Sequence, residues 1–571
     1  MIVATPAHGQ VLGQGGQDLT RADTLRGSIG PARAWWDVTF YDLEVRVDPA
    51  DSSLVGRTAI AYRVIEPGRE MQIDLQVPLE IDSVVQSGRR LETRREGNAF
   101  FATIAAAPRA GDFDTVTVYY HGKPTIAANP PWDGGLTLAR DSLGRPWIAT
   151  TDQGLGASVW WPNKDTQADE PDDGQRIAIT VPDSLVNVSN GRLRSVVNHD
   201  DGTTTWEWFV ENPINNYNVA INAGHYVHFG GVFQGEDGAL TLDFWPLDYH
   251  VDAARRQFEQ VRPTLACFEH WFGPYPWYRD GFKLIETPHL GMEHQSGIAY
   301  GNGYQNGYLG NDLSGTGLGL EWDFIIVHEA AHEWWGNNLT TADLADMWVH
   351  ESFGNYAESL YTECQHDEAA GADYVVGVRN GIQNDIPVLG TFGVNREGSG
   401  DMYPKGGNML HTIRQLVGDT EKWRGILRGL NEDYRHQIVT GQQVRDYIGE
   451  KAGRDLERVF EQYLETTDVP TLEYRLEAGG AGDAGAGEAG GAGAGEAGGT
   501  LHYRWTNVVD GFAMPIEAKV AADRCEVLTP TAEWQTTPVE VADPAAFDVD
   551  RDYYVRVRPE GGAARGAAAR C

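Results

Sequence analysis

Lysine is scarce in this chain. Lysine and arginine together number 45 against 82 aspartates and glutamates, only seven of the basic residues are lysines, and the formal net charge is -37. A surface this acidic repels phosphate at distances below the Debye length, so we expect no nucleic acid partner. The simplest explanation is a solvated acidic surface that keeps the protein soluble; adaptation to high salt, where carboxylates replace lysines, is the alternative.

Cysteine is also scarce, and long apolar runs are missing. The four cysteines show no paired spacing such as CxxC, which predicts neither a disulfide framework nor a cysteine-based metal site. No run of about 20 apolar residues occurs, so we expect no membrane span. The start, MIVATPAHGQVLGQGG, lacks the basic residues and long apolar core of a complete signal peptide. It resembles the remnant of one, which slightly favours an extracytoplasmic location over a cytoplasmic one.

The length and the aromatic content predict several folded domains. A chain of 571 residues is too long for one core, and one domain per 100 to 200 residues gives about three or four. The hydrophobic share is 41%, with 18 tryptophans, 23 tyrosines and 18 phenylalanines. Such a chain can bury a large apolar area despite its charge.

The pattern of apolar residues changes along the chain. Residues 36–226 contain stretches that alternate with period two, as at 177–181, and their turns are marked by Gly, Pro, Asn and Asp, which predicts a β-rich domain. Residues 253–272 then predict a helix that ends at a Gly-Pro pair, and residues 282–286 predict a strand. Helices are expected to dominate residues 320–464.

A segment of low complexity interrupts the C-terminal part. Residues 478–499 are almost wholly Gly, Ala, Glu and Asp and cannot form a packed core, so we expect a flexible loop. Alternating patterns flank it on both sides. We interpret it as an insertion between two strands of one small β-sandwich; a linker between domains is the alternative.

The most informative pattern is HEAAHEWWGNNLTTADLADMWVHE, which contains His328, Glu329, His332 and Glu351. In a helix, positions i and i+4 lie about 40° apart around the axis, so the two imidazoles converge on one ion. Glu351 lies in a second helical run, residues 344–365, and supplies a third ligand. Three protein ligands leave the fourth tetrahedral position to water, which is typical of a catalytic zinc site with one Zn²⁺ per chain.

Glu329 lies on the same helix face as the two histidines. Zinc lowers the pKa of water from about 15.7 towards about 7, and a carboxylate in this place can take the proton as a general base. A chance match to the short motif is the alternative interpretation. The glutamate that follows at the expected spacing argues against it.

The segment from His328 to Glu351 resembles the gluzincin signature of the aminopeptidase N and leukotriene hydrolase family of zinc metallopeptidases. The family continues with a tryptophan, a Gly-Asn pair and a threonine, and this chain has Trp334, Gly336, Asn337 and Thr340 at those places. The resemblance implies a multidomain α+β protein. Its parts would be a flexible segment 1–30, an N-terminal β-sandwich-like domain 31–235, a thermolysin-like, mainly helical zinc catalytic domain 236–469, a small C-terminal β-sandwich 470–560 with the insertion 478–499, and a flexible tail 561–571.

The resemblance also implies a substrate site. The family motif Gly-x-Met-Glu-Asn has its counterpart in Gly291, Met292 and Glu293, although the flanking Leu290 and His294 depart from the pattern. By resemblance, Glu293 accepts hydrogen bonds from the free amine of a peptide, and so does Gln153. Acceptors buried in this way select an ammonium, because an internal peptide bond would leave them unpaired at a cost of about 1 to 3 kcal/mol per group.

A third family motif, Tyr-x-Lys-Gly, is similar to the sequence from Tyr403 to Gly406. The phenol of Tyr403 would donate to the oxyanion that forms during hydrolysis. Longer family members continue into a helical domain that closes the substrate chamber. We therefore expect a more open cleft here, or closure by a partner subunit.

The expected function is that of a zinc-dependent aminopeptidase acting on peptides with a free N-terminus. One alternative is hydrolysis of an epoxide or an internal peptide bond by the same zinc centre. Another is a catalytically silent protein that keeps zinc for structure, against which Glu329 and Tyr403 argue, because structural coordination needs neither. The residues define no oligomeric state and no preference for the first side chain.

Overall fold

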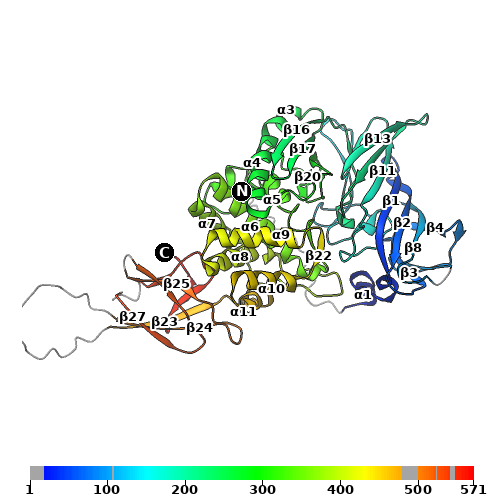
Figure 1. The fold of residues 1–571 in the computed structure, drawn as a ribbon. Coiled ribbons are helices and arrows are strands. Elements are labelled where there is room, and N and C mark those ends of the chain that lie inside the picture. The colour runs from blue at the N-terminus through cyan, green and yellow to red at the C-terminus, as the bar shows by residue number, and fades with distance from the viewer. Residues whose placement is uncertain (1–18, 106–107, 479–498, 522–523, 541–546) are drawn as a thin grey trace, which may run out of the picture.

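The computed structural model describes residues 19–105, 108–478, 499–521, 524–540 and 547–571. It is a mixed α+β protein with three regions, which Figure 1 shows in blue to cyan, in green to yellow, and in orange to red along the chain. The helical region lies in the centre, with a β region on either side.

The N-terminal region is built from three sheets. The largest has eight strands in the order β13-β14-β11-β1-β2-β8-β4-β5, and the smaller ones have the orders β12-β15-β10-β9 and β3-β7-β6. The strands, in chain order, are β1 (Trp36–Asp48), β2 (Ser53–Val64), β3 (Glu70–Asp74), β4 (Glu80–Gln86), β5 (Arg89–Arg90), β6 (Thr93–Glu96), β7 (Ala99–Thr103), β8 (Phe113–Gly122), β9 (Gly135–Arg140), β10 (Pro146–Thr151), β11 (Gln175–Pro182), β12 (Val186–Val188), β13 (Arg192–Asn198), β14 (Thr203–Val210) and β15 (Asn222–Gly224).

Burial alternates from residue to residue in these strands, as the period-two pattern predicts. Tyr41, Leu43 and Val45 of β1 are buried, while the residues between them are more exposed. Because side chains alternate between the two faces of a sheet, these three enter one core with Ile177 and Ile179 of β11, the parallel neighbour of β1.

The central region combines one sheet with most of the helices. Its five strands have the order β16-β17-β18-β20-β19. These strands are β16 (Phe229–Gly235), β17 (Gly238–Trp245), β18 (Phe282–Glu286), β19 (Gly291–Met292) and β20 (Ile298–Tyr300). The strand expected at 282–286 is confirmed as β18, and β16 pairs with β17 in an antiparallel hairpin.

The helices of this region follow the predicted pattern. The helix expected at 253–272 is divided into α3 and α4 by a short 3-10 turn. The bounds are α3 (Val251–Gln257), α4 (Val261–Phe272), α5 (Phe324–Ala331), α6 (Trp348–Gln365), α7 (Glu368–Gly377), α8 (Pro404–Val417), α9 (Thr420–Asp433), α10 (Gly441–Ala452) and α11 (Glu457–Glu465), with the short pair β21 (Leu339–Thr341) and β22 (Gln437–Val439).

Two sheets form the C-terminal region, with the orders β27-β24-β23-β29-β30 and β26-β25-β28. Their strands are β23 (Thr471–Ala478), β24 (Gly499–Thr506), β25 (Ile516–Ala521), β26 (Arg524–Leu528), β27 (Gln535–Val539), β28 (Asp548–Val549), β29 (Arg556–Pro559) and β30 (Arg565–Gly566). Ala478 and Gly499 are opposite each other in the antiparallel pair β23–β24. Residues 479–498, where the flexible loop is expected, lie outside the described residues and connect two adjacent strands.

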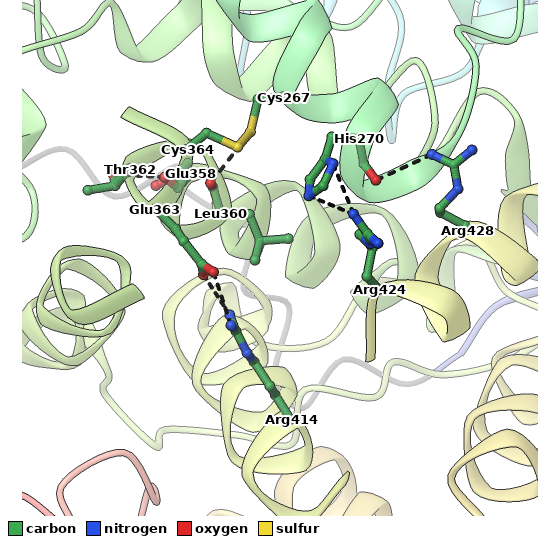
Figure 2. Close-up of a disulfide and its surroundings, with 10 residues drawn as sticks. All are labelled: Cys267, His270, Glu358, Leu360, Thr362, Glu363, Cys364, Arg414, Arg424 and Arg428. Carbon is green, nitrogen blue, oxygen red and sulfur yellow. Dashed lines mark hydrogen bonds and ion pairs between the residues drawn. A yellow bond between two sulfur atoms is a disulfide. The ribbon is translucent and has the colours of Figure 1, made fainter. Parts of the chain in front are cut away.

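The cysteine spacing predicts no disulfide framework, and this prediction is wrong. Cys267 pairs with Cys364 and Cys525 with Cys571, with Cα atoms 6.0 and 5.7 Å apart. These separations are within the range that a disulfide requires. Figure 2 shows the first bond where helix α4 meets helix α6. The pairs are 97 and 46 residues apart in sequence, so only the folded chain brings them together.

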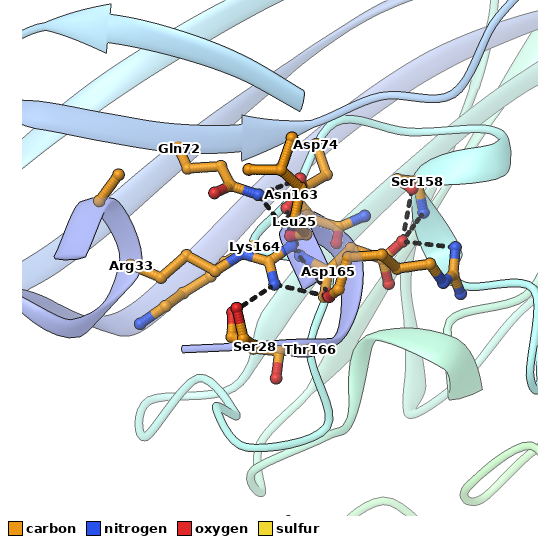
Figure 3. Close-up of polar contacts among 12 residues, drawn as sticks. Leu25, Ser28, Arg33, Gln72, Asp74, Ser158, Asn163, Lys164, Asp165 and Thr166 are labelled. Atoms are coloured by element: carbon orange, nitrogen blue, oxygen red, sulfur yellow. Dashed lines mark hydrogen bonds and ion pairs between the residues drawn. The ribbon is translucent and has the colours of Figure 1, made fainter. Parts of the chain in front are cut away.

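Part of the segment 1–30, expected to be flexible, is ordered. Residues 1–18 lie outside the described residues, but helix α1 (Arg21–Gly27) begins with a capping box in which Thr20 and Asp23 exchange hydrogen bonds. Helix α2 (Pro31–Ala34) follows and contains Arg33, which is fully buried. Its guanidinium lies 2.6 Å from Asp74 and donates to the carbonyl groups of Arg26 and Asp165 (Figure 3).

The tail 561–571 differs from expectation in the same way. Strand β30 pairs with β29, and Cys571 is joined to Cys525. Backbone pairing and a covalent bond therefore hold a segment that is expected to be flexible. Within the described part of the chain, no helix combines the length and the apolar character needed to cross a membrane.

Candidate metal centre and active site

Helix α5 positions the two histidines. The side chain of Asp323 caps its N-terminus by accepting from the backbone N–H groups of Ile325 and Ile326. His328 lies inside the helix, and His332 occupies the C-cap with helical backbone angles, φ -65° and ψ -18°. The spacing of four residues therefore keeps both imidazoles on one face, as the sequence predicts.

Helix α6 brings the third ligand. Oε2 of Glu351 lies 3.4 Å from Nε2 of His332 and 3.8 Å from Nε2 of His328, and the two Nε2 atoms are 3.3 Å apart. All three residues are at least nine-tenths buried. One ligand atom from each of His328, His332 and Glu351 therefore lies within 4.8 Å of the other two, close enough for all three to bind one metal ion.

The other nitrogen of each imidazole has a hydrogen-bond acceptor. Nδ1 of His328 lies 2.9 Å from Oε1 of Glu358, and Nδ1 of His332 lies 2.8 Å from the carbonyl oxygen of Trp335. An acceptor at Nδ1 fixes the proton there and leaves the lone pair of Nε2 free. Both rings are therefore in the tautomer that binds a metal through Nε2.

The charges of the centre suit a divalent cation. Burial raises the pKa of Glu351, but His332 and His328 outweigh it, and the pKa falls to about 2. Burial opposes protonation of His332, but Glu351 outweighs it and raises the pKa of that imidazole to about 10. Oε2 of Glu351 is buried without a hydrogen-bond donor among the described residues. Zinc accepts two imidazole nitrogens and a carboxylate oxygen in tetrahedral geometry, and its binding would require His332 to release its proton.

The carboxylate of Glu329 lies against the backbone of Gly291. A Cβ atom at Gly291 would come within 2.5 Å of Oε1 of Glu329, so a larger residue there would displace the carboxylate. Burial raises the pKa of Glu329, and although His328 opposes this, the pKa rises to about 7. A carboxyl group with a pKa near neutrality is suited to proton transfer.

The side chain of Gln153 joins two carboxylates beside the histidines, those of Glu293 and Glu351. Gln153 and Glu351 are 198 residues apart in the sequence. Nε2 of Gln153 donates to Oε1 of Glu293 at 2.6 Å and to Oε1 of Glu351 at 3.2 Å. The hydroxyl of Tyr217 donates to the same oxygen of Glu293 at 3.3 Å. The amide of Gln153 thus joins the predicted amine acceptor to the predicted metal ligand.

Gly291 and Met292 form the short strand β19, which leads directly to Glu293. The carbonyl oxygen of Glu293 accepts from Nδ2 of Asn337 at 2.8 Å. Through this contact the Gly-Asn pair holds the strand end that carries Glu293. Gly336 has φ +121°, a conformation that favours glycine, and the turn it allows directs Asn337 to the strand.

His294, where the family has asparagine, is fully buried, and neither ring nitrogen has a hydrogen-bond partner among the described residues. Leu290, the other departure, packs against the central core. The backbone nevertheless keeps β19 paired with β20, with Gly291 opposite Tyr300. Both departures therefore change side chains around the motif while the strand that carries Glu293 is retained.

Tyr403 lies at the N-terminus of helix α8 and faces the metal centre. Its ring centroid is 6.0 Å from that of His328. Burial, followed by the charge of Glu351, holds the pKa of this phenol well above its usual range. The hydroxyl therefore keeps its proton and is available as a hydrogen-bond donor.

Sequence reasoning missed Glu358 and Tyr217. Glu358 follows Glu351 by seven residues, two turns of helix α6, so it lies on the same helix face, and this spacing could have identified it. Tyr217 carries no comparable signal. It lies in a short 3-10 turn of the N-terminal region and reaches Glu293 only through the tertiary fold.

Comparison with known proteins finds similarity to peptidases. Residues 257–463 match the model of the Peptidase family M1 domain. The chain is 23% identical over 429 residues to Tricorn protease-interacting factor F2 of Thermoplasma acidophilum, which covers 71% of this chain and 50% of that protein. It is 24% identical over 303 residues to Aminopeptidase N of Streptomyces lividans, covering 48% and 34%. The chain thus spans about half the length of these curated relatives, or less.

A solved structure shares the fold. An M1 zinc metallopeptidase from Deinococcus radiodurans superimposes with a TM-score of 0.64 at 20% identity, covering 78% of this chain and 97% of that one. At this identity the similarity concerns the architecture. The structural match covers 78% of this chain, a larger part than residues 257–463, which the family model matches.

Proposed function

We propose that this chain, a member of the M1 family of metallopeptidases, is a zinc-dependent aminopeptidase that hydrolyses the N-terminal peptide bond of peptides. The observation that carries the proposal is the hydrogen bond from Gln153 to both Glu293 and Glu351. It supports a site for a free amine directly beside the atoms that converge on a metal.

Zinc would be held by Nε2 of His328, Nε2 of His332 and Oε2 of Glu351. When bound, it polarises the substrate carbonyl and lowers the pKa of a water molecule. Glu358 and the carbonyl of Trp335 keep the two rings in the orientation and tautomer that this requires.

Glu329 is the proposed general base. Its Oε1 lies at Gly291, on the strand that leads to the amine site, so a peptide bound there has its first carbonyl near this carboxylate. Glu329 takes a proton from the attacking water and later gives it to the leaving amine. This exchange typically contributes about 10² to 10⁴ in rate.

Glu293 and Glu351 are the proposed acceptors for the substrate ammonium. Each keeps acceptor capacity beyond the bond from Gln153, and charge-assisted hydrogen bonds to an ammonium are stronger than those to a neutral amide. A blocked N-terminus brings no positive charge and only one N–H donor instead of three. The site should therefore discriminate against acetylated peptides.

Tyr403 completes the proposed machinery. Its protonated hydroxyl donates to the carbonyl oxygen as negative charge develops there. Its ring centroid lies 6.0 Å from that of His328, so the hydroxyl approaches the metal centre from the N-terminus of helix α8.

The decisive experiment compares Glu329→Gln with the parent protein on aminoacyl chromogenic substrates, with zinc content measured for both. We expect Glu329→Gln to retain zinc and to lose about 10² to 10⁴ in kcat. A chelator should abolish the activity of the parent protein, and added zinc should restore it.

Blocked and unblocked peptides separate the rival functions. Cleavage of acetylated peptides at the same rate would indicate an endopeptidase, and turnover of an epoxide alone would indicate an epoxide hydrolase. A zinc-loaded protein that hydrolyses none of these would be a silent binding protein, and the proposed function would be abandoned.

A further inference from the structure

Helix α1, near the N-terminus, lies against the loop that carries Gln153. Arg26, in the last turn of this helix, donates from Nη2 to the carbonyl oxygen of Gly154 at 2.8 Å. Its Nη1 lies 3.8 Å from Oδ2 of Asp165, and 25% of its side chain is exposed. The guanidinium is therefore bound to the residue that directly follows Gln153.

The carbonyl group of Gly154 is the point where three segments of the chain meet. Besides Arg26, Nδ2 of Asn395 donates to the same oxygen at 2.9 Å, from a loop of the central region. Gly154 has φ +69°, a conformation that favours glycine, in a turn where the N–H of Leu155 donates to the carbonyl oxygen of Gln153 at 2.7 Å. A carbonyl oxygen has two lone pairs, so the two donors together fix its orientation.

Helix α1 and the two loops are in direct contact. A Cβ atom at Gly27 would lie 2.2 Å from the backbone nitrogen of Asn395. A Cβ atom at Gly156 would lie 2.5 Å from Nη2 of Arg26. Because both residues are glycines, the backbone segments and the guanidinium can approach this closely. Arg26 is therefore packed against the loop of Gln153.

Other side chains hold helix α1 in place. Nη1 of the buried Arg33 donates to the carbonyl oxygen of Arg26 at 2.7 Å. Nε2 of Gln72 donates to the carbonyl oxygen of Leu25 at 2.9 Å (Figure 3). Both bonds end on backbone atoms of the helix, so neither depends on the side chain of Arg26. Removal of the guanidinium alone should therefore leave the helix in place and release the loop.

The position of this loop matters to the proposed reaction because Gln153 reaches the carboxylates of the site. Its Nε2 donates to Glu293 at 2.6 Å and to Glu351 at 3.2 Å. These bonds use Nε2, so Oε1 keeps its capacity to accept from the ammonium of a substrate. A shift of the loop by about 1 Å would carry the amide beyond hydrogen-bond distance from both carboxylates.

We propose that Arg26 is a positioning residue for the substrate amine, because it holds the loop of Gln153 against the central region. The inference rests on the proposed aminopeptidase function and adds a residue that maintains the amine site. Arg26 acts through Gln153 and not by contact with the substrate. A guanidinium suits this task, since a hydrogen bond from a charged donor is stronger than one from a neutral donor.

The test compares zinc-loaded, full-length variants on a fluorogenic substrate. The substrate is the one that the parent protein cleaves fastest among the aminomethylcoumarin amides of alanine, leucine, phenylalanine and arginine. Arg26→Met keeps the apolar part of the side chain and removes the guanidinium, whereas Arg26→Lys keeps a charged donor. The matched control is Arg21→Met on the same helix, because the side chain of Arg21 is 68% exposed and pairs with Glu96.

We expect Arg26→Met to raise KM by about tenfold and to change kcat by no more than about twofold, because the lost interaction binds the substrate and the transition state alike. Arg26→Lys should keep part of the affinity. Arg21→Met should behave like the parent protein, and zinc content should be the same in every variant.

A double-mutant cycle separates positioning of the loop from general support of the fold. Gln153→Ala removes the amide through which Arg26 is proposed to act. Adding Arg26→Met to Gln153→Ala should therefore raise KM by no more than about a further twofold. A residue that only supports the fold would raise KM by the same factor in both backgrounds.

Three results would overturn the inference. An unchanged KM for Arg26→Met would show that the loop keeps its position without the guanidinium. The same factor in both backgrounds would show that Arg26 acts independently of Gln153, and a loss of zinc with a fall in kcat would assign it to folding. Each of these leaves the parent protein active and refutes the inference alone. A zinc-loaded parent protein that cleaves none of the four substrates would refute the proposed function as well.

Discussion

Oε1 of Glu358 lies 2.9 Å from Nδ1 of His328, and this contact joins helix α6 to helix α5 at the metal centre. The same carboxylate accepts from the hydroxyl of Tyr374 at 2.8 Å and from Nδ2 of Asn355 at 3.2 Å. Glu358 is fully buried. A carboxylate held by three donors fixes the orientation of the imidazole that faces the metal.

Glu358→Gln should therefore weaken zinc binding. Loss of such a partner typically costs about 10-fold to 100-fold in metal affinity. Competition with a fluorescent chelator measures the change. Glu363→Gln is the control, because Glu363 lies on the same helix but pairs with Arg414, 2.7 Å away (Figure 2), and should leave zinc affinity unaltered. Equal affinities for the two variants would refute this role for Glu358.

Tyr403→Phe removes the proposed donor to the oxyanion while keeping the ring. We expect kcat to fall by about 10² to 10³, equivalent to about 2.7 to 4 kcal/mol, with little change in KM. Steady-state kinetics on an aminoacyl substrate provide the measurement. Tyr434→Phe, a half-buried tyrosine beside Tyr447, should behave like the parent protein. A rise in KM at constant kcat would show that Tyr403 binds substrate without stabilising the transition state.

Replacing Cys267 and Cys364 by serine should lower the free energy of unfolding by about 2 to 4 kcal/mol, because the bond closes a long loop and restricts the unfolded chain. The second disulfide closes a shorter loop, so its removal should cost less in the same entropic picture. Differential scanning calorimetry of the two double variants compares them. Identical melting temperatures for both variants and the parent protein would contradict the expectation.

Arg33→Met should destabilise the N-terminal region by about 3 to 5 kcal/mol, since it leaves Asp74 charged and buried without its partner. Urea unfolding followed by tryptophan fluorescence measures the loss, and Arg33→Met combined with Asp74→Leu should recover part of it. The control is Arg46→Met at the exposed pair with Asp201, which should cost no more than about 1 kcal/mol. Similar losses for the two single variants would refute the claim.

Much of the architecture follows from local patterns. Alternation with period two identified the β-rich region, and strand β18 has the bounds that the sequence indicates. The motif from His328 to Glu351 lies within residues 257–463, which match the model of the Peptidase family M1 domain, as the resemblance predicts. The disulfides could not be foreseen, because a pairing between distant cysteines depends on how helices pack and not on spacing.

The order in residues 19–30 was missed for a related reason. The expectation of flexibility used no distant residues, whereas the contacts that hold this segment come from strands and loops far along the chain. Arg26 donates to the carbonyl oxygen of Gly154 at 2.8 Å, and Arg33 reaches Asp74. Tertiary contacts of this kind outweigh the low local propensity of a short helix.

The sequence by itself determined that the two candidate metal-binding histidines share one face, because four-residue spacing on a helix keeps His328 and His332 together wherever that helix lies. Only the tertiary structure decided the rest of the site. Gln153 belongs to the N-terminal region, yet its amide lies 3.2 Å from Oε1 of Glu351 in the central region. Helical geometry acts over a few residues, whereas the meeting of distant loops depends on the packing of whole regions, which no short pattern encodes.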